Sequence, residues 1–230
     1  MNGVDLRVRR GSIHALIGPN GAGKTTCFNL LTHFLTPTAG SIHYKGRDIT
    51  HASPAQIAHM GLVRSFQISA VFPRMTVLEN VRIGLQSRKV SSYAFWRSES
   101  SLRALDDAAR ALMADVGLEP FQDTLAMELS YGRKRALEIA TTLALDPELL
   151  LLDEPTAGMT HEDVERITEL IARVAANRTV LMVEHNLSVV SSLSHTITVM
   201  QRGEVLAEGP YETVAADPRV IEAYLGAPDE

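Results

Sequence analysis

The stretch that decides the fold is Gly18-Pro19-Asn20-Gly21-Ala22-Gly23-Lys24-Thr25, which fills every position of the phosphate-loop motif G-x-x-x-x-G-K-[ST]. An apolar run ending at Ile17 precedes it, and a helical pattern carrying Phe28 and Leu31 follows it. Glycines let the backbone curl until successive N–H groups face phosphate oxygens, and the helix adds its positive N-terminal end. We therefore predict that this loop binds the phosphates of a nucleoside triphosphate.

Side chains within and after the loop have separate predicted roles. Lys24 reaches the β- and γ-phosphates, and the Thr25 hydroxyl ligates Mg²⁺. The nucleotide-binding residues expected in this segment are Gly18, Pro19, Asn20, Gly21, Ala22, Gly23, Lys24, Thr25 and Thr26. Cys27 follows directly and is the single cysteine of the chain, so an internal disulfide is excluded. For Cys27, a buried position in the helix is favoured over a redox role.

The composition limits the classes of partner. With 230 residues, the chain suits one domain or one domain with an inserted subdomain. Its net charge of −5 and pI of about 5.9 give no reason to expect a nucleic-acid partner. No stretch approaches the roughly 20 apolar residues of a membrane span, and the first residues lack the pattern of a signal peptide. We therefore expect any contact with a membrane to be made through a partner protein.

Apolar runs alternate with helical patterns along the chain, which predicts an α/β fold. The expected strands cover residues 4–8, 13–17, 62–66, 149–152, 179–183 and 196–200, with a hairpin at 42–49. The expected helices include residues 24–34, 132–145, 162–176 and 220–225. This order favours a P-loop NTPase with a mainly parallel sheet, right-handed crossovers and an antiparallel β part near the N-terminus. A helical pattern between residues 68 and 130 predicts an inserted helical subdomain within a single domain, residues 1–230.

A second strand end supplies acidic residues. Leu149–Leu152 has the pattern of a buried strand, and Asp153 and Glu154 follow at its C-terminal tip. Asp153 can hold Mg²⁺, often through water, and Glu154 can polarise the attacking water as a general base. The upstream phosphate loop favours this assignment over an accidental acidic turn.

Two further polar residues lie at predicted strand ends, where ligands gather in such sheets. Gln67 is expected to reach the metal ion or the water, and His185 to contact the γ-phosphate. A lone histidine at a strand end is more often a hydrogen-bonded structural residue than a catalyst. Glu184, which precedes His185, is interpreted as an ordinary polar neighbour.

The segment Leu129-Ser130-Tyr131-Gly132-Arg133 begins another predicted helix. A serine hydroxyl, a glycine N–H and a helix N-terminus together form a second anion site around Ser130 and Gly132. Because the chain already has one phosphate cradle, a second one suggests that ATP is shared between two copies.

The chain resembles the ATP-binding subunits of ABC transporters over essentially its whole length. The motifs that carry this resemblance, in the family's order, are the phosphate loop, Gln67, residues 129–133, Asp153-Glu154 and His185. The resemblance implies a head-to-tail dimer with a second ATP-binding subunit, homo- or heterodimeric, that sandwiches two ATP molecules with Mg²⁺. Ser130 and Gly132 of one copy then face the γ-phosphate held by Lys24 of the other.

The same resemblance implies partners and a location. Integral membrane permease subunits dock on a groove near Gln67, where Phe72, Pro73 and Met75 form an apolar lip. Closure of the ATP-bound dimer then drives the permease, as a population shift between two states. A periplasmic or extracellular solute-binding protein takes part indirectly. The chain is expected at the cytoplasmic face of the inner or plasma membrane, held peripherally through the permease subunits.

Shorter segments resemble one subgroup, the importers of branched-chain and other hydrophobic amino acids. These segments are residues 64–67, 131–132, 136–140, 157–160 and 223–226. Importers of urea and short amides, and the ATPases of lipopolysaccharide export, are the alternatives. A soluble ABC ATPase acting on DNA or ribosomes is disfavoured by the acidic charge, and by a sequence without a second ATPase unit or a long coiled coil. A non-catalytic module that switches by dimerising is disfavoured because Asp153 and Glu154 are both present.

Three features depart from the wider family. Tyr131 and Arg133 stand where glycine and glutamine are usual, although tyrosine is common in the subgroup. Thr160 stands where many relatives place an aspartate that orders the dimer interface. Relatives also usually carry, upstream of the residues matched here, an edge strand and an aromatic side chain that stacks on adenine. Since base stacking contributes about 1–3 kcal/mol, we expect nucleotide affinity to fall about tenfold or more unless another residue of the chain covers the base.

Overall fold

Our computed structural model describes residues 1–65, 71–89 and 105–225 of the chain. Gln67 lies outside the described residues, as does the predicted strand end at Phe66. The chain divides into two compact units. The first unit contains Met1–Arg64, Glu148–Ala157 and Val174–Glu230, and the second contains Ser65–Pro147 and Gly158–Arg173.

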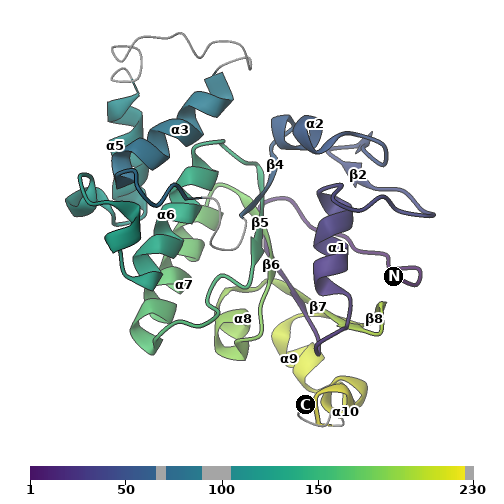
Figure 1. Cartoon of the computed structure of the whole chain (residues 1–230). Coiled ribbons are helices and arrows are strands. Elements are labelled where there is room, and N and C mark those ends of the chain that lie inside the picture. The colour runs from purple at the N-terminus through teal and green to yellow at the C-terminus, as the bar shows by residue number, and fades with distance from the viewer. Residues whose placement is uncertain (66–70, 90–104, 226–230) are drawn as a thin grey trace. The chain divides into compact units, whose positions relative to one another are not determined.

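A six-stranded sheet with the order β4-β5-β6-β1-β7-β8 organises the first unit (Figure 1). Its strands are β1 (Ile13–Ile17), β4 (Leu62–Ser65), β5 (Leu149–Asp153), β6 (Thr179–Val183), β7 (Thr196–Gln201) and β8 (Glu204–Gly209). β1 pairs in parallel with β6 and β7, β5 pairs in parallel with β6, and the pair β7 and β8 is antiparallel. The mainly parallel α/β sheet expected from the sequence is therefore confirmed.

Strand register brings two segments of interest to one edge of this sheet. Leu16 of β1 and Asp153 of β5 both pair with Val183 of β6, so the carboxyl ends of these strands are level. The segments that leave this edge begin at Gly18 and Glu154. In parallel sheets, ligands bind outside the carboxyl ends of the strands. The register thus sets the phosphate loop and the acidic turn at the edge where a ligand is expected.

One face of the sheet is covered by α1 (Lys24–Leu31), α2 (Pro54–His59) and the antiparallel hairpin of β2 (His43–Tyr44) and β3 (Arg47–Asp48). The core on this face consists of Leu16, Ala22, Cys27, Phe28, Ile49, Ile57, Leu62, Leu151, Leu181, Val183 and Met200. Burial raises the pKa of the Cys27 thiol to about 11, which agrees with a core position. Because side chains alternate along a strand, Asp153 shares the face of Leu151 and points to the α1 side.

Two predicted elements differ from the structure for physical reasons. Residues 4–8 form no strand, although Val4, Leu6 and Val8 pack against the core. Their alternation with exposed residues indicates burial of one face, whereas a strand also needs the backbone hydrogen bonds of a partner. The helix after the phosphate loop ends at Leu31 rather than near residue 34, because His33 takes a left-handed conformation with φ of 57°.

The C-terminal part of the first unit contains elements that the sequence pattern did not predict. These are β8, α8 (Leu187–Leu193) and α9 (Tyr211–Ala215), whereas α10 (Pro218–Leu225) was expected. β8 has partly exposed residues throughout, so it lacks the apolar run that marks the buried strands. Its pairing with β7 depends on a neighbour in space and is invisible in its own composition.

The second unit is helical. Its elements are α3 (Val77–Lys89), α5 (Asp106–Asp115), α6 (Tyr131–Leu143) and most of α7 (His161–Ala175), with 3₁₀ turns at Glu119–Phe121 and Ala126–Glu128. α3, α5 and α6 pack against one another. The predicted insertion, residues 68–130, falls within this unit and stays a prediction. Within the described ranges, no helix has the length and apolar character that a membrane crossing requires.

Candidate nucleotide-binding site

The phosphate loop leaves β1 through a position that only glycine can occupy. Gly18 has a φ of 148°, and a Cβ placed on it would lie 2.2 Å from the backbone oxygen of Met200. The backbone of the loop therefore runs directly against β7. Further along, the Ala22 N–H donates to the Pro19 oxygen at 3.1 Å and closes a turn. Left-handed values of φ at Gly21 and Gly23 complete the curl that the motif predicted.

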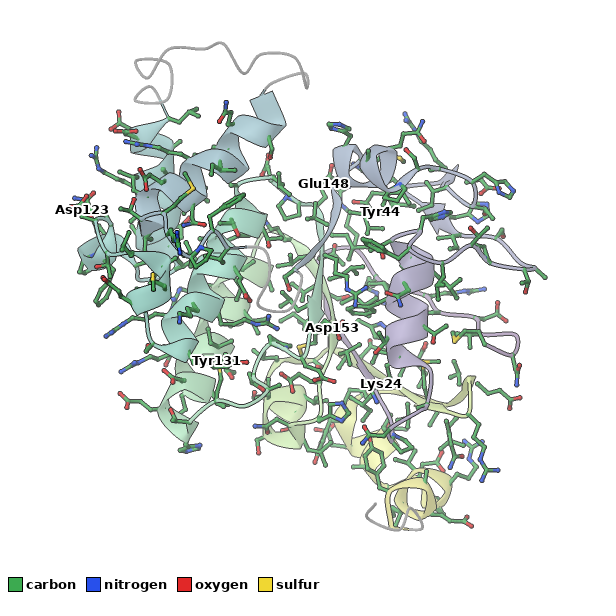
Figure 2. All side chains as sticks on the ribbon, viewed as in Figure 1. Lys24, Tyr44, Asp123, Tyr131, Glu148 and Asp153 are labelled. Carbon is green, nitrogen blue, oxygen red and sulfur yellow. The ribbon has the colours of Figure 1, made fainter. Side chains whose placement is uncertain are left out.

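Lys24 lies inside this curl. Its side chain is buried, and its ammonium donates to the backbone oxygens of Gly18 at 2.7 Å and Pro19 at 3.1 Å. Burial lowers the pKa of Lys24, while the negative charges of Glu154 and Asp153 act to raise it. The lysine and both carboxylates are therefore close enough to interact. In Figure 2, Lys24 starts α1 and Asp153 ends β5 at the same edge of the first unit.

The N-terminal end of α1 is suited to an anion. Gly23 is its N-cap and offers no side-chain acceptor to the first N–H groups, and the first turn holds no acidic residue. The positive potential at this helix end is therefore not neutralised by the helix's own side chains, and an anion can bind there. Thr25 is exposed and Thr26 half-buried, so Thr25 is accessible to solvent at this end of the helix. The sequence-predicted cradle, residues 18–26, forms one continuous segment around this helix end.

Tyr224 of α10 also reaches the phosphate loop, although it belongs to none of the nucleotide-binding motifs. Burial raises the pKa of the Tyr224 hydroxyl to about 12, and a hydrogen bond with the Gly18 backbone acts in the opposite direction. The position of this tyrosine shows that the end of the chain packs against the start of the loop. Its signal in the sequence is the segment 223–226, which was noted as a subgroup feature.

Asp153 is buried and forms an ion pair with Arg64 of β4. Arg64 also donates to the side-chain oxygen of Asn29 at 2.7 Å and lies 5.5 Å from the centre of the Phe28 ring. The sequence assigns Arg64 no role of its own beyond the subgroup segment 64–67; the signal for one is a charged residue inside the apolar strand Leu62–Ser65. The pair gives the carboxylate a cationic partner in the structure.

The donor set of this site fits Mg²⁺ bound together with a nucleotide. Asp153 and the Thr25 hydroxyl supply hard oxygen ligands, and Mg²⁺ typically uses one or two carboxylates with substrate phosphates and water. Among the residues that the structure describes, no group of three or more His, Cys, Asp or Glu side chains forms a metal site of its own. Gln67, the third predicted ligand, is outside these residues.

The structure brings Glu154 and His185 into contact, a pairing that the sequence pattern did not predict. His185 Nε2 lies 3.0 Å from Glu154 Oε1, so a hydrogen on Nε2 donates to the carboxylate. The Glu154 side chain is 30% exposed and that of His185 is 45% exposed, which leaves both open to solvent. Glu154 is also a conformational outlier, because its φ is +46° in a residue other than glycine.

Glu184, which the sequence suggests is an ordinary polar neighbour of His185, is a buried hydrogen-bond acceptor in the structure. Its side chain is buried and accepts four hydrogen bonds. Two come from the N–H and hydroxyl of Thr156, at 2.9 and 2.6 Å. The others come from the N–H groups of His185 and Asn186, at 3.0 and 3.2 Å. An acidic residue directly after the fully buried strand Thr179–Val183 was the signal for such a role.

The predicted second anion site belongs to the second unit. Ser130 is the N-cap of α6 and is exposed, and within the described residues its side chain makes no cap hydrogen bond. Gly132 lies against α7, since a Cβ placed on it would be 2.5 Å from an Asp163 side-chain oxygen. The glycine is thus required by close packing, while the serine hydroxyl remains exposed at the helix N-terminus.

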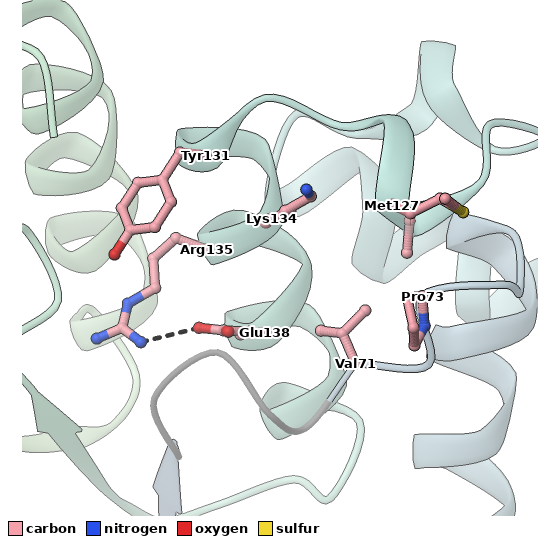
Figure 3. A pocket seen from close by; sticks show the side chains of 8 residues that line it. Val71, Pro73, Met127, Tyr131, Lys134, Arg135 and Glu138 are labelled. Carbon is pink, nitrogen blue, oxygen red and sulfur yellow. Dashed lines mark hydrogen bonds and ion pairs between the residues drawn. The ribbon is translucent and has the colours of Figure 1, made fainter. Parts of the chain in front are cut away.

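A pocket of about 360 Å³ lies beside this helix (Figure 3). Its lining residues are Val71, Pro73, Ala126, Met127, Tyr131, Lys134, Arg135 and Glu138. Arg135 and Glu138 form a buried ion pair at 2.8 Å. The side chains of Met127 and Tyr131 are exposed, as is that of the adjacent Phe72. The pocket therefore combines an apolar rim with charged residues from one helix.

Two family models match the chain. One described as ABC transporter matches residues 1–157, and one described as branched-chain amino acid ATP-binding cassette transporter matches residues 204–230. The chain is 42% identical to the high-affinity branched-chain amino acid transport ATP-binding protein LivG of Salmonella typhimurium, over 98% of this chain and 91% of that protein.

Solved structures are similar over most of the chain. A nucleotide-free ATP-binding cassette from an ABC transporter has a TM-score of 0.85 and 32% identity, with 98% of this chain and 92% of that one covered. A dimeric cassette in a post-hydrolysis state, bound to ADP and Pi, has a TM-score of 0.74 and 25% identity, with 90% and 88% covered. These similarities extend well beyond the phosphate loop itself.

Proposed function

Since this chain belongs to the ABC transporter family of ATP-binding proteins, we propose that it is the ATP-hydrolysing subunit of an importer for branched-chain or other hydrophobic amino acids. The observation that carries the ATPase part is the convergence of Lys24, Asp153 and Glu154 at one sheet edge. Similarity to a branched-chain amino acid transport protein, and the family match at residues 204–230, support the substrate class.

In this proposal the phosphate loop binds ATP through its backbone and Lys24. The ammonium of Lys24 already lies within the loop, held by two backbone oxygens. Phosphate oxygens replace these acceptors when ATP binds, and the anion also gains the N-terminal end of α1. Thr25, Asp153 and Gln67 hold Mg²⁺, which neutralises charge on the phosphates. ATP and Mg²⁺ are thus the cofactors that the site is built to accept.

Two neighbouring carboxylates have different surroundings and therefore different proposed roles. Asp153 is buried and paired with Arg64, and its proposed role is to bind Mg²⁺. Glu154 is partly exposed and interacts with His185, so it can take a proton from the attacking water. His185 lies beside that carboxylate and is proposed to contact the γ-phosphate. This division of labour is the basis of the proposed hydrolysis.

The proposed active form is a dimer with a second ATP-binding subunit. Ser130 and Gly132 at the N-terminus of α6 contact the γ-phosphate held by the other copy. The exposed Ser130 hydroxyl supports this role, because a capping serine normally bonds to its own helix. Similarity to a dimeric cassette bound to ADP and Pi supports it as well.

The pocket of the second unit is the proposed docking site for the permease. Its rim includes Val71, Pro73 and Met127, and exposed Phe72 lies next to it. A permease segment with an apolar face fits such a rim, and Lys134 adds a positive charge at the pocket wall. The subunit is then peripheral at the cytoplasmic face of the membrane. A solute-binding protein acts through the permease and not through this chain.

Reconstitution of the chain with its permease and solute-binding protein in proteoliposomes tests the proposal. We expect ATP hydrolysis that leucine, isoleucine or valine stimulates and that urea does not. Lys24→Ala is the control that abolishes nucleotide binding without touching the pocket. Stimulation by urea alone would overturn the substrate class, and absence of ATP turnover in every preparation would overturn the ATPase assignment.

A further inference from the structure

We propose that Glu184 is a positioning residue that holds Glu154 in the strained backbone conformation from which its carboxylate acts. The inference deepens the proposed function and rests on Glu154 being the general base. Glu184 itself is buried, and its bond with Thr156 links it to the turn that carries Glu154, through which it acts.

The strain is visible in the turn after β5. Glu154 has a φ of +46°, a left-handed conformation that residues with a Cβ rarely adopt. Its N–H donates to the Val183 oxygen at 2.9 Å, and its own oxygen accepts from the Ala157 N–H at 3.2 Å. Strained residues persist where the surroundings over-determine them, and they concentrate at functional sites.

Hydrogen bonds accepted by Glu184 connect this turn to the segment that follows β6. One carboxylate oxygen accepts from both donors of Thr156, two residues after Glu154. The other oxygen accepts from the N–H groups of His185 and Asn186. The His185 imidazole in turn contacts the Glu154 carboxylate, so these interactions form a closed circuit from Glu154 through Thr156, Glu184 and His185 back to Glu154. Glu184 therefore fixes the two sides of the Glu154–His185 contact relative to each other.

A carboxylate is the side chain that this position requires. Four donors converge on two oxygens, and an ionised carboxylate accepts at both of them. An amide of the same shape carries N–H donors on one side, so at least one pair of these bonds is replaced by a donor facing donors. Burial prevents water from compensating for that loss.

The consequence for catalysis is control of distance. Glu154 and His185 come from different strand ends, and their contact is 3.0 Å. A base displaced by a fraction of an ångström to an ångström loses alignment with the water that it must deprotonate, which costs up to about 100-fold in rate. ATP binding depends instead on residues 18–26. Loss of Glu184 should therefore lower kcat and leave nucleotide affinity unchanged.

Two variants and one matched control test the inference. We expect Glu184→Gln to lower kcat about 10- to 100-fold. Thr156→Val removes one of the four bonds, and we expect a loss of a few-fold to about tenfold. In both, the KM for ATP and the affinity for a fluorescent ATP analogue stay unchanged. The control is Thr198→Val, which removes a buried hydroxyl that donates to Glu208 at 2.8 Å on β7 and β8, and its kcat is expected to stay unchanged.

The Glu154→Gln background separates positioning from general damage. If Glu184 acts through Glu154, single-turnover hydrolysis by Glu154→Gln is not slowed further by Glu184→Gln. A further loss in that background, a raised KM with an unchanged kcat, or an equal loss in Thr198→Val would overturn this inference alone. If Glu184→Gln does not fold, Thr156→Val decides, because it retains Glu184. Unchanged turnover in Glu154→Gln itself would overturn the base assignment, and this inference with it.

Discussion

The phosphate loop and the turn after β5 leave the same edge of one sheet, and both contain left-handed backbone. The loop obtains it from glycines, with φ of 148° at Gly18 and 104° at Gly23. The turn obtains it from Glu154, at a φ of +46°. The two segments therefore both contain positive φ values, but the loop has glycine at these positions and the turn has glutamate.

The difference follows from which atoms make the function. In the loop, backbone N–H groups are the proposed donors to the ligand, so glycine can fill the left-handed positions without loss of a functional side chain. In the turn, the side chain of Glu154 is the proposed base, so glycine is excluded and the strain must be tolerated. Strain at such a position costs about 1–3 kcal/mol. Each hydrogen bond to a charged partner contributes about 1.5–3 kcal/mol, which is of the same size as this strain.

The largest expected effect comes from removing the proposed base while its backbone is kept. Glu154→Gln retains the shape and the N–H bond to Val183, but the amide cannot accept a proton from water. We expect hydrolysis to slow by roughly 10²–10⁴, about 3–5 kcal/mol of barrier, with ATP binding unchanged. Phosphate release measures the rate, and size-exclusion chromatography with ATP should show accumulated dimer. Near-normal turnover would mean that the turn is strained for another reason.

The next largest effect is expected in the phosphate loop. There, the crowding of an added Cβ can be distinguished from the strain of a positive φ. Gly18→Ala places a Cβ 2.2 Å from the Met200 oxygen, so the loop and β7 must move apart. We expect a loss of more than about 3 kcal/mol in the free energy of unfolding, together with lost ATP binding. Gly40→Ala is the control, since Gly40 has a φ of 91° and nothing lies within 4 Å of its Cβ position. Gly40→Ala should lower the free energy of unfolding by only about 1 kcal/mol. Urea denaturation of both variants measures the two losses. Equal losses would show that crowding at Gly18 is not the deciding factor.

The sequence predicts those parts of this site that depend on local pattern. Gly18–Thr25 is recognisable because the loop needs its glycines and lysine at fixed spacing, and Leu149–Leu152 because a buried strand needs an apolar run. The level ends of β1, β5 and β6 follow from parallel pairing. The places of Glu154 and His185 beside strand ends follow from the same pattern, whereas their contact with each other does not.

Contacts between distant residues were not predictable in the same way. Arg64 pairs with Asp153 across 89 positions, and Glu184 bonds to Thr156 across 28. A local sequence pattern does not identify the partner of a buried charged side chain. It indicates only that such a side chain must have a partner. β8 was missed for a related reason, because its stability comes from β7 and not from its own half-exposed residues. Residues 4–8 show the opposite case. They alternate as a strand does, but they form no ladder of backbone hydrogen bonds with a neighbouring strand.

The smallest expected effect measures the strain itself. At a φ of +46°, Glu154→Gly relieves the clash of Cβ with the backbone, whereas Glu154→Ala keeps it; both variants lose the carboxylate equally. We expect the glycine variant to be more stable by about 1–2 kcal/mol in urea denaturation. At Ala172, exposed on α7, the alanine protein should instead be more stable than the Ala172→Gly variant by about 1 kcal/mol, which controls for the general flexibility of glycine.

Repeating the comparison of Glu154→Gly with Glu154→Ala in a Glu184→Gln background tests whether Glu184 maintains the strain. If Glu184 holds the turn left-handed, its loss lets residue 154 relax, and the advantage of glycine over alanine should shrink; an undiminished advantage would mean that the Val183 bond alone maintains the strain.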